Sequence, residues 1–213
     1  MNFFRTNLFF TLFFLFTFHT VSGQRFDGGF KGGLAASEVS GDNLGGPDKF
    51  GWFASVFTKT SVGTNTRMQL ELMYIQKGSR SRPNEKNNFY DYRFNLQYAE
   101  IPVVAIVDFS SAGRQGLTRQ FSLEAGLSVS FLVGTREVEN ELVLDLSQQK
   151  PYNDGEINIL LGLYYPVTDW LDFHLRFSQG VTPIRPHLGG AATWYNQGQY
   201  NTVWTFGLSW SFL

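Results

Sequence analysis

The 213-residue sequence contains no cysteine. A disulfide framework, a thiolate metal site and a lipid-modified N-terminal cysteine are therefore excluded. The 17 basic and 18 acidic residues nearly balance, giving a formal net charge of −1 and no strong field that would attract nucleic acid. Beyond the N-terminal segment, no stretch is long and apolar enough to predict a membrane-spanning helix. Aromatic residues (17%) and 22 glycines are instead plentiful and indicate an all-β protein.

The N-terminal segment, residues 1–23, is predicted to be a secretory signal peptide. Arg5 supplies its positive charge, residues 8–18 are an unbroken run of Leu, Phe and Thr, and Val21-Ser22-Gly23 forms a small-residue cleavage site. The apolar run is shorter than the ~20 residues of a membrane-spanning helix, so a retained anchor is the less favoured alternative. Residues 24–213 are enough for one domain.

The rest of the chain is dominated by strict alternation between large apolar residues and small or polar ones. In residues 202–212 one face carries Thr202, Trp204, Phe206, Leu208, Trp210 and Phe212. The other face carries Val203, Thr205, Gly207, Ser209 and Ser211. A period of two predicts a β-strand, because successive side chains point to opposite faces of a sheet.

Eight such strands are predicted, at residues 26–36, 50–59, 67–77, 92–107, 121–133, 157–165, 171–177 and 202–212. Both faces of the second strand are apolar, so its orientation stays open. In the fourth, Phe94, Leu96 and Tyr98 share one face, but the next apolar set begins at Ile101. A β-bulge at Ala99-Glu100 would put both sets outward and keep the Glu100 carboxylate away from hydrocarbon.

Longer and shorter connections alternate along the chain, as long external loops and short periplasmic turns do in outer-membrane barrels. The sequence therefore predicts an all-β fold, an eight-stranded antiparallel transmembrane β-barrel. It would be an up-and-down meander with a side-chain-filled interior and both chain ends in the periplasm. The alternative is a soluble, lipocalin-like barrel, whose bulky face would point inward around a ligand.

The charged and titratable residues predicted to face the interior are Lys31, Glu71, Glu124, Asp172, His174 and Arg176. An eight-stranded barrel is just wide enough for side chains to fill, so these charges must pair. A charge network is the favoured interpretation, and a catalytic dyad of Asp172 with His174 is the alternative. A metal site joining His174 and His187 is less favoured. Because no catalytic or phosphate-binding motif is present, we expect no enzymatic activity, no catalytic residue, no cofactor and no metal.

Three segments together resemble the PorT-type outer-membrane β-barrel family of the Bacteroides group. They are Glu71-Leu72-Met73-Tyr74 followed by Lys77-Gly78, then Tyr98-Ala99-Glu100-Ile101-Pro102, then a strand centred on Gly126. Ala99 stands where the family commonly has leucine. Barrels of this kind usually end in an aromatic residue that the insertion machinery reads, whereas here Phe212 is followed by Leu213.

The resemblance implies an integral barrel in the outer membrane of a Gram-negative cell, and the family's namesake takes part in protein secretion. We therefore expect a structural, binding or secretion-accessory role through long extracellular loops. The expected partners are outer-membrane lipid and lipopolysaccharide, the barrel-insertion machinery and secretion-system proteins, but not nucleic acid. A lipid-modifying enzyme and a narrow pore are the alternatives for a membrane barrel.

Overall fold

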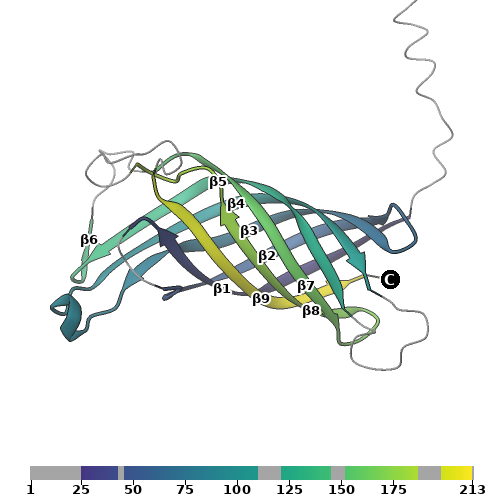
Figure 1. Cartoon of the computed structure of the whole chain (residues 1–213), viewed down its shortest axis with the longest axis horizontal. Helices are drawn as coiled ribbons and strands as arrows, with labels where there is room; N and C mark the ends of the chain where they lie inside the picture. Colours follow the sequence, from purple (N-terminus) through teal and green to yellow (C-terminus); the bar gives the residue numbers. More distant parts are fainter. Residues whose placement is uncertain (1–24, 43–45, 110–120, 145–151, 187–197, 213) are drawn as a thin grey trace, which may run out of the picture.

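The structure is a computed structural model that describes residues 25–42, 46–109, 121–144, 152–186 and 198–212. The predicted signal peptide and His187 lie outside the described residues. Across the described ranges, no helix has the length and hydrophobicity needed to cross a membrane. Figure 1 shows that the described chain forms one elongated ring of tilted strands.

Eight long strands and one two-residue strand are present in the described ranges. They are β1 (Phe26–Ser40), β2 (Lys49–Ser61), β3 (Thr66–Ser81), β4 (Tyr92–Asp108), β5 (Ser122–Glu139), β6 (Leu142–Val143), β7 (Gly155–Pro166), β8 (Leu171–Gly180) and β9 (Tyr200–Ser211). A 3-10 helix, η1 (Glu85–Asn87), lies between β3 and β4. Each predicted strand is present, several of them longer than predicted.

The long strands form a closed meander. Each pairs antiparallel with the next long strand along the chain, and β9 pairs with β1 to close the ring, while β6 extends only the end of β5. Gly33 faces Gly207 across this closing seam. A Cβ on Gly33 would lie 2.1 Å from the Phe206 carbonyl oxygen, so the close approach of β1 and β9 requires glycine there. The predicted closed, eight-stranded antiparallel fold is confirmed.

Large apolar side chains cover the outside of the barrel, and polar side chains face the inside. Leu127 on β5 is 56% exposed, whereas Glu124, on the opposite face of the same strand, is 2% exposed. On β2, Trp52 points outward while Phe53 and Phe57 are buried inside, which settles the orientation of that strand. Thr202 is an exception to the predicted outward set, because it is buried. A lipocalin-like barrel with its bulky face inward is therefore wrong.

The predicted bulge at Ala99-Glu100 is wrong. β4 alternates without interruption, so Phe94, Leu96 and Tyr98 are fully buried on the same inward face as Glu100. These three side chains belong to an apolar cluster inside the barrel. The other members of the apolar cluster are Ala35, Val39, Phe53, Met73, Ile75, Tyr152, Ile184 and Val203. The prediction failed because it assumed that apolar residues face outward along the whole strand.

A register irregularity does occur, but on the partner strand. Gln97 of β4 pairs with Gly134 of β5, and the next residue, Tyr98, pairs with Leu132. Val133 is therefore the extra residue of a β-bulge on β5. Before the bulge even-numbered residues such as Ser130 are buried, and after it Glu137 is buried instead. The bulge thus reverses the faces of β5 and turns the Glu137 carboxylate inward.

Strands β3, β4 and β5 have 16, 17 and 18 residues, more than the ~9–11 residues that cross a membrane at the usual tilt. Their extra length lies toward the end of the barrel that carries η1 and β6. Figure 1 shows β6 at the end opposite to the chain's C-terminus. One wall of the barrel therefore extends beyond the thickness of a bilayer.

The orientation of β4 can be tested in this cysteine-free chain with single cysteines. We expect Ile101→Cys to react with a lipid-soluble maleimide in the folded protein, because Ile101 is 40% exposed on the outer face. Leu96→Cys should react only after unfolding, because Leu96 is fully buried. The measurement is labelling yield by mass spectrometry, with unfolded samples as the control. Equal labelling of both folded variants would place both residues on the outer face and support the bulge at Ala99-Glu100.

Candidate functional site

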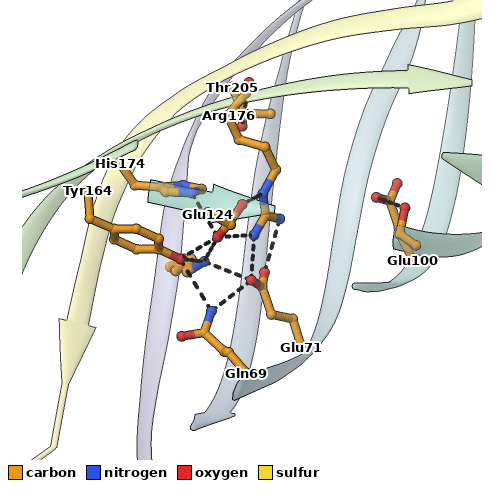
Figure 2. Close-up of polar contacts among 10 residues, drawn as sticks. Gln69, Glu71, Glu100, Glu124, Tyr164, His174, Arg176 and Thr205 are labelled. Atoms are coloured by element: carbon orange, nitrogen blue, oxygen red, sulfur yellow. Dashed lines mark hydrogen bonds and ion pairs between the residues drawn. The ribbon is translucent and has the colours of Figure 1, made fainter. Parts of the chain in front are cut away.

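The candidate site is the barrel interior, where most of the predicted charged residues meet. Arg176 on β8 lies between Glu71 on β3 and Glu124 on β5 (Figure 2). Its Nη2 lies 2.5 Å from Glu71 Oε1, and its Nε lies 2.5 Å from Glu124 Oε1. Lys31 on β1 adds a second cation, with its Nζ 2.7 Å from Glu71 Oε1 and 3.8 Å from Glu124 Oε2. These four residues, here called the first network, carry two positive and two negative charges.

Neutral groups complete the first network. Tyr164 on β7 donates a hydrogen bond to Glu124 Oε2 at 2.8 Å, and Gln69 Nε2 donates to Glu71 Oε1 at 2.8 Å. His174 Nε2 lies 3.4 Å from Glu124 Oε2, and its ring packs on Tyr164 with the ring centroids 4.4 Å apart. Burying charge is expensive unless hydrogen bonds compensate for lost water, and here every carboxylate has several donors.

Asp172 is the one predicted member that does not join the first network. It lies on the inward phase of β8, near the short turn at residues 167–170, and is half-buried. Among the described residues, no hydrogen bond or ion pair links it to the other five predicted residues. Lys59 and Arg67 are its main charged neighbours. Arg67 itself pairs with Asp108, with Nη2 and Oδ1 2.5 Å apart, at the same end of the barrel.

A second network was missed by the sequence prediction. Lys77 on β3 reaches Glu100 on β4 at 2.8 Å and Glu156 on β7 at 2.9 Å. The surplus carboxylate charge is compensated by neutral donors. Ser128 and Ser130 donate to Glu100 at 2.7 and 2.9 Å, and Asn201 Nδ2 donates to Glu156 at 2.5 Å. Alternation from Glu71 would have placed Lys77 inside, but Glu156 lies before the predicted start of its strand.

A third group, the mouth cluster, closes the loop end of the barrel. Arg185 contacts Glu137 of β5 and two residues outside the strands, Tyr152 and Gln199. Its Nη1 lies 3.3 Å from Glu137 Oε1, and its Nε donates a hydrogen bond to Gln199 Oε1 at 2.5 Å. Tyr152 donates to Glu137 and accepts from Arg185 at 3.0 Å. Burial, supported by the hydrogen bond to Glu137, raises the pKa of Tyr152 well above its usual range, so the hydroxyl stays protonated.

The charged side chains of the three groups are all buried. His174, the residue that base catalysis would need, is 1% exposed and faces Glu124 and Tyr164 inside the barrel. In the described residues, no group of three or more His, Cys, Asp and Glu side chains is arranged to hold a metal ion. The arrangement neutralises the charges that are buried inside the barrel.

The residues that carried the family resemblance are structural in this arrangement. Glu71, Lys77 and Glu100 belong to the two networks. Gly78 adopts a φ of 138°, and a Cβ there would lie 2.2 Å from the Phe94 carbonyl oxygen. The Lys-Gly pair thus combines a buried cation with a backbone conformation that favours glycine.

Residues 19–185 match the family described as "Outer membrane protein beta-barrel domain". The chain belongs to this family. It is a bacterial outer-membrane β-barrel, and the apolar outer face is the surface that contacts lipid. No curated protein matches the sequence.

Solved structures of two bacterial proteins are similar to this outer-membrane barrel. Ail, the attachment invasion locus protein of Yersinia pestis, is 11% identical with a TM-score of 0.44; the match covers 87% of this chain and 98% of Ail. Neisserial surface protein A is 13% identical with a TM-score of 0.44, and the match covers 88% of this chain and 97% of that protein.

We expect Arg176→Met to destabilise the outer-membrane barrel by about 3–5 kcal/mol, because Glu71 and Glu124 would lose their shared buried partner. Adding Glu124→Gln restores the charge balance with Lys31 and Glu71, so the double variant should lose less than the single variant. Urea unfolding in lipid vesicles, followed by tryptophan fluorescence, measures both. A double variant as unstable as the sum of the two single variants would show that the pair is not coupled.

Proposed function

We propose that this outer-membrane barrel is a closed, non-conducting protein that acts as a binding or secretion-accessory component through its loop end. The observation that carries the proposal is the filled interior. The first network, the apolar cluster, the second network and the mouth cluster all occupy it, and both networks are built from side chains of several strands. A lumen of this kind offers no continuous water path, so function must reside on the outer surfaces.

The secretion-accessory role rests on the PorT-type resemblance. Its charged motif residues, Glu71, Lys77 and Glu100, hold the interior together, so they support a shared barrel architecture more strongly than a shared partner. The partners proposed for the loop end are secretion-system proteins. Outer-membrane lipid, including lipopolysaccharide, surrounds the wall, and the barrel-insertion machinery acts during assembly.

A lipid-modifying enzyme is the weaker candidate. It would need a histidine, an acid and a nucleophile that a membrane lipid can reach. His174 is buried inside the first network, and Asp172 lies closer to the turn end. Neither residue faces the lipid or the loop end, so we do not assign catalysis to this protein.

We further propose that residues 1–23 are removed as a signal peptide and that both ends of the mature chain, residues 24–213, lie in the periplasm. The long connections and β6 would then lie outside the cell. An even number of barrel strands places the two ends on one side, and short turns are typical of the periplasmic side. The turn between β7 and β8 spans only residues 167–170.

Planar-bilayer recordings test the closed interior. The purified full-length protein should insert without producing discrete conductance steps, because buried charge pairs and the apolar cluster block the lumen. A water-filled porin prepared in the same detergent is the control for insertion. Reproducible single-channel steps that depend on protein concentration would contradict the proposal and favour a pore.

Single-cysteine labelling in intact cells tests the orientation. Leu142→Cys, at a residue that is 72% exposed on β6, should react with a membrane-impermeant maleimide. Asp169→Cys, in the exposed turn at the opposite end, should react only after the outer membrane is permeabilised. The reverse pattern would place the loops in the periplasm and overturn the proposed orientation.

A further inference from the structure

The outer face of the long wall changes character at one level. Along β4 the outward residues Val103, Ile101 and Ala99 are followed by Gln97, Asn95 and Arg93, running toward the loop end. On β3 the outward Tyr74 is followed by Gln76 and then Arg80, and on β5 the outward Val133 is followed by Arg136. The apolar band of a membrane barrel ends where aromatic and polar residues replace aliphatic ones. This level is therefore the headgroup boundary of the wall.

A cationic groove lies directly beyond that boundary, on the outside of β2, β3, β4 and β5. Its volume is about 330 Å³. The cations that line it are Lys49, Arg80, Arg82, Arg93 and Arg136. Asp48 is the one acidic side chain lining the groove in the described part of the chain.

The groove holds more positive charge than the protein neutralises. Arg82 pairs with Asp48 at 3.4 Å, and Arg80 lies 3.7 Å from Asp91. For Lys49, Arg93 and Arg136, no carboxylate among the described residues lies within ion-pair distance.

Arg80 and Arg93 are also direct cross-strand neighbours, and Asn95 faces Arg136 in the next pair of strands. Like charges placed directly opposite one another destabilise a sheet. The strands thus hold two guanidinium groups against their mutual repulsion, at the edge of the lipid-facing surface. An anion bound between them would remove that repulsion.

We propose that this groove binds the phosphate group of an outer-leaflet glycolipid, such as the lipid A part of lipopolysaccharide. Guanidinium groups bind phosphate through paired, charge-assisted hydrogen bonds, and two unpaired arginines on adjacent strands provide such donors. Asn95, which also lines the groove and lies directly across from Arg136, adds a neutral donor.

Two observations favour a membrane lipid over a free anion. The groove lies next to the apolar band, because Gln76, which lines it, donates a hydrogen bond to the Tyr74 hydroxyl at 3.3 Å. Acyl chains of the same molecule would lie on that band against the exposed Leu72 and Ile101. The Trp52 and Tyr74 rings pack with their centroids 4.8 Å apart on that band, below Gln76, as side chains at the headgroup level do. The inference relies on the proposed orientation only for the choice of the outer leaflet.

Binding to bisphosphorylated lipid A tests the proposal with the full-length protein refolded in detergent micelles. Native mass spectrometry of a lipid titration gives the dissociation constant. The double variant Arg93→Gln/Arg136→Gln should bind about tenfold more weakly or worse, because two charge-assisted contacts are lost. The control Arg25→Gln removes one positive charge at the opposite end of the barrel and should bind like the unmodified protein.

Two further binding measurements, with dephosphorylated lipid A and with inorganic phosphate, test whether the protein recognises a lipid phosphate. The unmodified protein should bind dephosphorylated lipid A about tenfold more weakly, and the double variant should show no further loss with that lipid. Equal affinity for both lipids, or equal affinity of the double variant and the unmodified protein, would overturn the proposal. Inorganic phosphate that competes at the same concentration as lipid A would show a free-anion site and overturn the lipid assignment.

The heat-dependent mobility of the folded barrel on a detergent gel checks each variant. If the double variant does not fold, Arg93→Gln and Arg136→Gln are titrated separately, and each should weaken binding about threefold. Two single variants that fold and bind normally would overturn the proposal. A detergent micelle does not distinguish the extracellular from the periplasmic end of the barrel. The binding result therefore does not depend on the labelling experiment that tests the orientation in cells.

Discussion

The structure depends first on the closure of its sheet. Lipid supplies no hydrogen-bond partner, so each backbone N–H and C=O in the membrane must pair within the ring, and an open edge is excluded. The seam between β1 and β9 meets this requirement with Gly33 opposite Gly207, where the backbones come too close for a Cβ. Once eight strands are closed, the lumen has the width of packed side chains. Closure thus restricts which side chains can lie inside. A charge inside the barrel has little water to solvate it and must be compensated by other side chains.

The two buried networks solve that problem in different ways. The first balances two cations against two carboxylates, so Arg176 and Lys31 neutralise Glu71 and Glu124 directly. The second has one lysine for two carboxylates and uses hydroxyl and amide donors for the remainder. Both networks join strands that are distant along the ring, such as β3 with β8 and β3 with β7. They therefore link opposite sides of the barrel through side-chain ion pairs. The backbone hydrogen bonds of the sheet connect only neighbouring strands.

Most of this fold was predictable because each strand's alternation is a local property. The faces of β5, β7, β8 and β9 follow from period two, and with them the inward positions of Glu124, His174 and Arg176. What the sequence could not indicate are contacts made by segments far apart in the chain. Tyr152 and Arg185 reach Glu137 from two separate loops. Gly134, next to the bulged Val133, is the kind of residue that often marks a bulge, but it does not indicate which side chains meet inside the barrel. The participation of Lys77, Glu100 and Glu156 in one network likewise depends on register between three strands.

The failure on β4 has a more general cause. A hydrophobic pattern reports which face meets which medium, and the medium outside this barrel changes along the strand. Within the membrane the outside is hydrocarbon, so Val103 and Ile101 point outward and Glu100 inward. Beyond the headgroups the outside is water, so Arg93 and Asn95 point outward while Phe94 and Leu96 pack inside. The backbone geometry is the same throughout, and only the solvent has changed. A reversal of pattern without a bulge thus locates the membrane surface on the strand, and Arg93 and Arg136, which have no carboxylate partner among the described residues, line the groove beside that surface.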